Sequence, residues 1–262
     1  MKPIKLLSAV LLLYGSLYIH SAAAVQRVYL MAGQSNMSGT ASTRQLPAGY
    51  RYTPSNVTFY HKGQRRPLGQ YGRFGPEVSF AHYLSRTFPN DEHIIIKYAA
   101  GGSDIQQWMP GNRYYRNMLK EVRNSLKQPN PKVDAIFWMQ GESDAMNKFR
   151  ARHYGNRLSH FIRSLRRDLR SPSSLFVIGQ INPEGNGYPM VSEIQRTQQQ
   201  INAQVWNTRL VSSHGLGKSY DKVHYSAKGQ MELGRRFANA YLGGHRTNLA
   251  KKFESELLSI IQ

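Results

Sequence analysis

The chain has 262 residues, which suits one medium domain or two small ones and allows a sizeable core. It contains no cysteine, which excludes disulfides, thiolate metal sites and cysteine nucleophiles. The formal net charge of +20 indicates an anionic partner, such as a polyanionic glycan, a membrane surface or nucleic acid, or else a merely soluble cationic surface. No known nucleic-acid-binding pattern is present, so nucleic acid is not an expected partner.

The first 24 residues are predicted to be a signal peptide. Lys2 and Lys5 precede an apolar run, and a small-residue cleavage site ends at Ala24. The alternative is a membrane anchor, but the run is shorter than the roughly 20 apolar residues of a bilayer span, and Gly15 interrupts it. We therefore expect export, to the periplasm or the medium, and a catalytic or binding body over residues 25–245.

Apolar runs and amphipathic stretches alternate along this body. In chain order we expect a strand over 27–32, a peripheral strand over 56–60, a helix over 75–88, a strand over 93–100, a helix over 114–127, a strand over 133–140, a helix over 147–170, a strand over 174–181, a helix over 191–206, a weak strand over 208–213 and a helix over 227–242. This alternation predicts an α/β sandwich with a mainly parallel sheet. No internal repeat and no interdomain linker is visible.

Two of the amphipathic helices raise questions of their own. The basic helix over 147–170 is predicted to face the core with Phe149, Tyr154, Leu158, Phe161 and Leu165. Residues 246–262 are predicted to form an extra amphipathic helix. This helix would pack on the body, contact a partner or lie on a membrane, and the sequence does not choose among the three.

Glycines and small polar residues follow each strong strand. The turns read GQSNMSG, GGSDIQQW, GESDA and NPEGNGY, and a further polar segment, SYDKVHYSAKG, precedes the last helix of the body. In parallel α/β sheets, ligands bind beyond the carboxyl ends of the strands. Because all of these turns open on that edge, we expect them to form one functional site.

A serine and a histidine stand out among these turns. Ser35 either caps the helix that follows the first strand or is a nucleophile, and a serine nucleophile needs a base. His224 is the candidate base, because Asp221 lies three residues earlier and can orient its ring. The alternative for His224 is an ordinary surface histidine beside the start of a helix.

An attack by Ser35 would create an oxyanion, which needs fixed hydrogen-bond donors. The backbone N–H groups of Ser35 and Gly102 are candidates, since glycine allows the main chain to approach a ligand closely. The side-chain amide of Gln140, at the end of a strand, would complete the set. The alternative for Gln140 is a strand-end residue that bonds a neighbouring loop.

Four motifs, GQSN, GGS followed by IQQW, WMQGESDA and D-x-x-H, together resemble the SGNH hydrolase superfamily. More narrowly, they resemble the sialate O-acetylesterase-like domain, which includes carbohydrate esterase family 6. The resemblance implies a three-layer α/β/α fold and the hydrolysis of acetyl esters on sugars with no metal and no other cofactor.

The resemblance also implies roles for individual residues. Ser35 would be the nucleophile, His224 the base and Asp221 the residue that orients it. Gly102 and Gln140 would join the Ser35 amide in the oxyanion hole. The supporting residues of the site are Gln34, Asn36 and Glu142, the last with a structural or orienting role at the edge of the site.

The substrate is less well defined. Trp108 and Tyr225 are candidate stacking platforms for a sugar, or else core residues, and Arg73 would contact an acidic group of the substrate or be a solvated loop charge. Ser103 and Asp104 depart from the motif, which places the substrate in question more than the reaction. We expect an acetylated polysaccharide, sialoglycan or peptidoglycan. The alternatives are an esterase or lipase for other acyl esters, and a non-catalytic protein that binds an anionic glycan.

Overall fold

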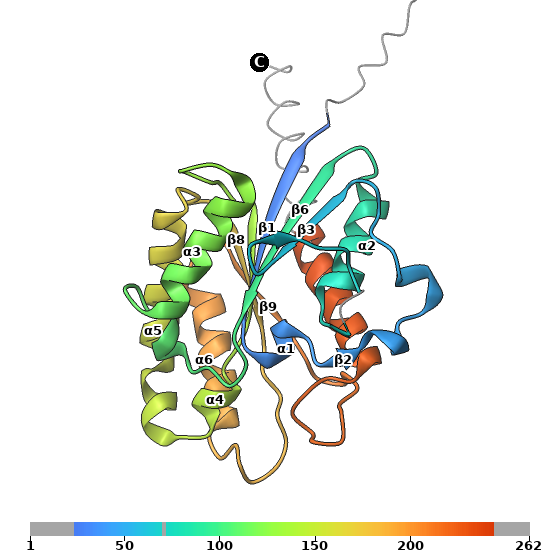
Figure 1. The fold of residues 1–262 in the computed structure, drawn as a ribbon. Helices are drawn as coiled ribbons and strands as arrows, with labels where there is room; N and C mark the ends of the chain where they lie inside the picture. Colours follow the sequence, from blue (N-terminus) through green and yellow to red (C-terminus); the bar gives the residue numbers. More distant parts are fainter. Residues whose placement is uncertain (1–23, 70–71, 244–262) are drawn as a thin grey trace, which may run out of the picture.

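The computed structural model describes residues 24–69 and 72–243 (Figure 1). Within them a seven-stranded sheet has the order β4-β3-β6-β1-β7-β8-β9, in which all strands except β4 run parallel. Its strands are β1 (Gln26–Gly33), β3 (Val57–His61), β4 (Gln64–Arg65), β6 (Glu92–Ala99), β7 (Ala135–Met139), β8 (Leu175–Gly179) and β9 (Thr208–Val211). The predicted leader and the helix predicted over 246–262 lie outside the described residues, apart from Ala24.

Helices cover both faces of this sheet. The helices longer than one turn are α2 (Glu77–Thr87), α3 (Arg113–Leu126), α5 (Lys148–Asp168), α6 (Val191–Gln204) and a helix over residues 227–243. Figure 1 shows α3, α5 and α6 on one face, and α2 with the helix over 227–243 on the other. The predicted three-layer α/β/α sandwich is confirmed. Among the described residues, no helix is both long and apolar enough to cross a bilayer.

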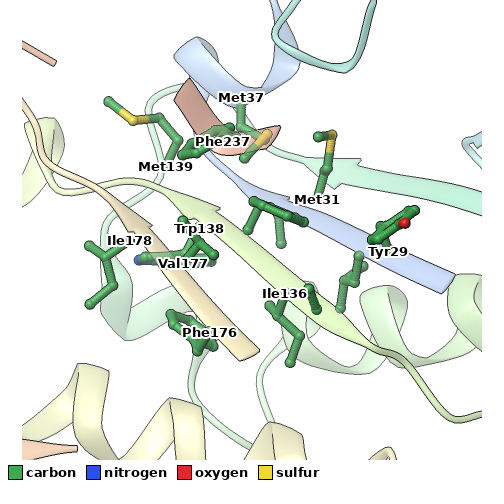
Figure 2. Packing of buried hydrophobic residues seen from close by; sticks show 14 of the residues in the cluster. Tyr29, Met31, Met37, Ile136, Trp138, Met139, Phe176, Val177, Ile178 and Phe237 are labelled. Atoms are coloured by element: carbon green, nitrogen blue, oxygen red, sulfur yellow. The ribbon is translucent and has the colours of Figure 1, made fainter. Parts of the chain in front are cut away.

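The central strands are apolar along their whole length because both of their faces are covered. On β7, Phe137 packs against Phe237 of the helix over 227–243, with ring centroids 5.4 Å apart. The next residue, Trp138, points to the opposite face and packs against Phe161 of α5 at 4.6 Å. Figure 2 shows Trp138 and Phe237 among the buried apolar side chains around β1, β7 and β8. Alternation along one strand therefore joins the two helical layers into one core.

Several short features differ from the prediction. A ribbon of β2 (Ala41–Ser42) and β5 (Arg73–Phe74) was not expected, because two-residue strands leave no periodic pattern. Phe149, predicted to face the core, is 64% exposed. It lies in the first turn of α5, where its ring stacks near His153 instead of reaching the sheet.

Candidate active site

The candidate site lies at the point where the strand order changes direction: β3, β4 and β6 lie on one side of β1, and β7, β8 and β9 lie on the other. β1 is the central strand of the sheet, between β6 and β7, and the polar turns after all three strands meet at its carboxyl end. Gly33 ends β1 with a φ of +146°, and a Cβ at this position would lie 2.1 Å from the carbonyl oxygen of Met139. Only glycine allows this close approach of β1 and β7. The turn that carries Ser35 is thereby held against the end of β7.

Ser35, His224 and Asp221 form one hydrogen-bonded chain. The Oγ of Ser35 lies 2.8 Å from Nε2 of His224, although 189 residues separate them in the sequence. Nδ1 of His224 lies 2.6 Å from Oδ2 of Asp221. With Nδ1–H donated to the carboxylate, Nε2 is free to accept the serine proton. The structure thus brings together the three predicted residues in the geometry of an activated serine.

The loop that carries the histidine is fixed by the same aspartate. Oδ1 of Asp221 accepts the backbone N–H groups of Val223 and His224, at 3.0 and 2.9 Å. Burial raises the pKa of Asp221, but the hydrogen bonds from the His224 ring and from these two amides outweigh it, so the pKa lies below the ordinary value. Asp221 therefore stays ionised over the pH range in which histidine acts as a base.

Asn36 connects the turn that carries Ser35 to the loop that carries His224. Its Nδ2 donates to Oε1 of Glu142 at 2.7 Å and to the carbonyl of Val223 at 3.1 Å, and its Oδ1 accepts the N–H of Tyr225 at 3.1 Å. Asn36 and Glu142 are both buried. Because burial disfavours the carboxylate, the pKa of Glu142 is raised. Glu142 thus holds the side chain of Asn36, and the structural or orienting role predicted for Glu142 stays a prediction.

Gln34 holds the turn after β7 in a similar way, by hydrogen bonds. Its Oε1 accepts the backbone N–H groups of Gly141 and Ser143, at 3.2 and 3.4 Å, and its own N–H donates to the carbonyl of Met139. Gln34 and Asn36 flank Ser35 in α1 (Ser35–Ser38) and its N-terminal cap. One residue on each side of the serine therefore anchors a different loop of the site.

The turn after β6 supplies backbone next to the serine. A Cβ added to Gly101 would lie 3.8 Å from Cβ of Ser35, so this glycine turn borders Ser35. Gly102 has a φ of +69°, a conformation that favours glycine. Ser35 is the first residue of α1, so its N–H has no acceptor within that helix. The backbone donors predicted at Ser35 and Gly102 thus lie on the two turns that meet at the Ser35 hydroxyl.

The prediction that the Gln140 side chain contacts an oxyanion is wrong for this arrangement. Gln140 is fully buried, and its Nε2 donates to the carbonyl of Ser103 at 3.0 Å and to Oδ2 of Asp144 at 2.6 Å. Both protons of the amide nitrogen are used within the protein. The side chain instead bonds the loop that follows Gly102, which was the alternative interpretation for this residue.

Asp144 is the second member of this buried connection. Its Oδ2 also accepts the N–H of Ile105 at 3.0 Å, so the carboxylate joins the turn after β6 to α4 (Glu142–Ala145). Burial raises the pKa of Asp144 to about 7. No sequence pattern distinguished this aspartate from a solvated loop residue, because the raised pKa depends on its tertiary surroundings.

The two aromatic residues predicted to stack on a sugar are core residues. Trp108 is fully buried, donates its Nε1–H to Oγ of Ser103 and packs edge-on against Trp138. Tyr225 is also buried, with its ring turned into the core. Both rings are packed around the turns of the site, although Tyr225 also borders the pocket beside the triad.

Other residues line the space beside the triad. A pocket of about 530 Å³ is bordered by Asp221 and His224, and also by Arg73 and Tyr220. Tyr220 is 96% exposed, and the sequence analysis did not single it out as a candidate. Its position directly before Asp221 was the available signal.

The two residues that depart from the motif have structural partners. Ser103 accepts the indole N–H of Trp108 and donates to the carbonyl of Ala100. Asp104 caps the short helix η3 (Ile105–Trp108), and its Oδ2 lies 3.5 Å from Nε of Arg150. The negative charge of Asp104 is therefore accompanied by a positive one.

Known proteins share this sequence pattern and this fold. A family model described as carbohydrate esterase, sialic acid-specific acetylesterase, matches residues 25–243. A probable carbohydrate esterase of Arabidopsis thaliana is 27% identical over 251 residues, which cover 86% of this chain and 93% of the relative. A probable 9-O-acetyl-N-acetylneuraminic acid deacetylase of Escherichia coli is 28% identical over 134 residues, which cover 42% of this chain and 41% of the relative.

Solved structures agree on the fold. The Arabidopsis thaliana protein superposes with a TM-score of 0.72 at 24% identity, covering 84% of this chain and 98% of its own. A carbohydrate acetylesterase from Xanthomonas citri gives a TM-score of 0.62 at 19% identity, covering 82% of this chain and 55% of its own. With the family model extending over nearly all of the described residues, the chain belongs to the carbohydrate esterase family of sialic acid-specific acetylesterases and is a carboxylic ester hydrolase.

Proposed function

We propose that this protein removes O-acetyl groups from carbohydrates through a Ser35–His224–Asp221 triad. The observation that carries the proposal is the continuous hydrogen-bonded chain from Ser35 Oγ through both ring nitrogens of His224 to Asp221. A serine hydroxyl in contact with an oriented neutral imidazole is suited to nucleophilic attack on an ester. Family membership supports an acetyl ester on a sugar as the substrate.

In the first half-reaction, Ser35 Oγ attacks the acetyl carbonyl carbon while His224 Nε2 accepts the hydroxyl proton. The carbonyl π electrons move to oxygen, and the backbone N–H groups of Ser35 and Gly102 stabilise this oxyanion. When the tetrahedral intermediate collapses, the bond to the sugar oxygen breaks. His224 gives its proton to that oxygen, which leaves as a hydroxyl and leaves Ser35 acetylated.

In the second half-reaction, a water molecule takes the place of the sugar. His224 Nε2 accepts a proton from the water as its oxygen attacks the acetyl group. Collapse of the second intermediate returns the proton to Ser35 Oγ and releases acetate. Asp221 remains ionised throughout and stabilises the imidazolium that forms in each half-reaction.

Charge around the site favours an anionic carbohydrate. Arg73 borders the pocket beside His224 and also a second pocket, of about 370 Å³. The second pocket is lined by Lys62, Arg66 and Lys97 as well, with Glu77 as its acidic residue. We propose that Arg73 contacts an acidic group of the substrate and that the exposed ring of Tyr220 packs on a sugar face.

The proposal is tested by acetate release from acetylated xylan, acetylated sialoglycan and acetylated peptidoglycan, measured beside p-nitrophenyl esters of increasing acyl length. We expect acetate from at least one of the acidic glycans and a sharp fall in turnover beyond the acetyl ester. Rapid hydrolysis of long acyl esters with no acetate from any glycan would favour the lipase alternative. Glycan binding without turnover of any ester would favour the non-catalytic alternative.

A further inference from the structure

A cationic pocket lies near the amino-terminal end of β8, at the opposite end of the strands from the triad. A pocket of about 460 Å³ is lined by Arg163, Arg166, Arg167, Arg170 and Pro172. These residues occupy the last turns of α5 and the loop that leads into β8. The triad lies beyond the carboxyl ends of the strands, so the length of β8, about 16 Å at the usual rise per residue, separates the two sites.

Arg166 is the buried member of this pocket. Its exposed fraction is 8%, and its guanidinium donates to the carbonyls of Ser174, Trp206 and Asn207 at 2.7 to 3.1 Å. Over residues 24–69 and 72–243, no carboxylate lies within salt-bridge distance of it. Burial lowers the pKa of this guanidinium. Buried charges in proteins are normally paired, so carbonyl dipoles alone leave the positive charge of Arg166 uncompensated.

The surrounding arginines add to this charge. Arg163 and Arg170 are exposed, and Nη1 of Arg163 donates to Oγ of Ser159, a neutral acceptor. Arg167 is paired with Asp168, but that carboxylate also accepts the phenol of Tyr115 at 2.7 Å. The lining of the pocket itself contains four cations and no acid. Several guanidinium groups around one hollow are suited to bidentate binding of an oxyanion.

An exposed indole lies beside the pocket. Trp206 is 68% exposed, and the Arg166 guanidinium carbon lies 5.7 Å from the centre of its ring. The backbone carbonyl of the same tryptophan accepts Nη1 of Arg166. An exposed aromatic face costs free energy in water, and aromatic faces pack on the apolar faces of sugars. A tryptophan next to an arginine pocket therefore favours a ligand that combines a ring with a negative charge.

We propose that this pocket is an accessory, non-catalytic binding site for an anionic sugar unit. The carboxylate, sulfate or phosphate of the unit would be bound by the exposed guanidinium groups of Arg163 and Arg170, next to the buried charge of Arg166, and the sugar ring would pack on Trp206. Such a site would hold an anionic glycan on the protein independently of the chemistry at Ser35. The proposal does not depend on which ester the triad hydrolyses.

The tryptophans provide a direct readout of this site. The chain has three, of which Trp108 and Trp138 are fully buried, so exposure-dependent fluorescence reports on Trp206. The probe is a short sulfated dextran, with the neutral dextran of the same length as its control. We expect the sulfated probe to protect Trp206 from acrylamide quenching and the neutral one to leave it accessible. Trp206→Phe should abolish the signal, while calorimetry still detects weakened binding.

Variants separate this site from general attraction to a basic protein. The double variant Arg163→Gln/Arg170→Asn removes two pocket charges, and asparagine tolerates the positive φ of residue 170. The matched control, Arg65→Gln/Arg86→Gln, removes two exposed charges elsewhere. We expect the pocket variant to bind at least about tenfold more weakly, since a charge-assisted hydrogen bond is worth a factor of that size. The control should lose less than about threefold, as expected for diffuse charge.

Each remaining outcome would overturn the proposal. Equal losses in the two double variants would mean that binding is diffuse. The same protection of Trp206 by inorganic sulfate at equal concentration would mean that the pocket takes a free ion. Protection by phosphatidylglycerol vesicles but not by sulfated dextran would assign the surface to a membrane.

Hydrolysis of p-nitrophenyl acetate by both double variants should equal that of the wild type, because neither pair of residues contacts the triad.

Discussion

Replacing Asn36 by alanine would disconnect the nucleophile turn from the histidine loop. Asn36 is fully buried and makes three hydrogen bonds, to the carboxylate of Glu142, the carbonyl of Val223 and the N–H of Tyr225. Alanine would leave all three partners in place without their donor or acceptor. Two of these partners flank His224, so both the stability and the catalytic geometry of the protein should be affected.

The structure sets the size of the effect. A hydrogen bond to a charged group contributes about 1.5–3 kcal/mol and each neutral one about 0.5–1.5 kcal/mol, so the three bonds together amount to about 2.5–6 kcal/mol of unfolding free energy. The main contribution is the carboxylate of Glu142, which remains buried after its donor is removed. A displacement of His224 by about 1 Å would lower kcat about a hundredfold. KM should change little, because Asn36 contacts no substrate.

Urea unfolding followed by circular dichroism gives the stability, and p-nitrophenyl acetate hydrolysis below the transition gives kcat. In Asn36→Ala/Glu142→Gln the buried charge is gone, so this double variant should be more stable than Asn36→Ala alone. Its kcat should stay low, because Val223 and Tyr225 remain unanchored. The reasoning would be refuted if Asn36→Ala unfolded within about 0.5 kcal/mol of the wild type, the range of ordinary surface changes.

Three other changes have defined outcomes. The pKa of Asp144 is raised to about 7, so protonated Asp144 stabilises the fold and this contribution is lost as pH rises. The wild type should lose up to about 3 kcal/mol of unfolding free energy between pH 5 and 7. An equal loss in Asp144→Asn, which has no carboxyl group to titrate, would contradict this. Lys97→Met removes the ion-pair partner of the buried Glu77, whose Oε1 lies 2.9 Å from Nζ of Lys97, and should cost about 3–5 kcal/mol of unfolding free energy. The double variant Lys97→Met/Glu77→Gln should recover most of this loss. Unchanged unfolding of the single variant would argue against that pair. Tyr220→Ala should raise KM for an acetylated glycan but not for p-nitrophenyl acetate. If the variant had the same KM as the wild type for the glycan, Tyr220 would have no part in substrate binding.

Most of the fold follows from the sequence because the parallel strands are unbroken apolar runs. β6 and β7 stand out in this way, and α3 between them shows clear amphipathic spacing. The position of the site also follows, since polar turns after parallel strands must share one edge. Ser35, Asp221 and His224 could be identified in this way before any distance was known.

The direction of individual side chains did not follow from the sequence. Trp108 and Gln140 lie in polar turns, but both point inward, to Ser103 and to Asp144 respectively. Whether a residue at a strand end faces the ligand or the core depends on partners far away in the chain. The arginine pocket was hidden for the same reason, since Trp206 joins it only through the packing of the turn before β9 against α5.

The central claim is that the hydroxyl of Ser35 performs the acyl transfer. Acetate release by Ser35→Ala, measured with an acetylated glycan and with p-nitrophenyl acetate, tests this most directly. The account predicts a loss of about 10⁴-fold or more in kcat, with the circular dichroism spectrum and the urea midpoint of the wild type. Turnover within tenfold of the wild type by a correctly folded Ser35→Ala protein would contradict it.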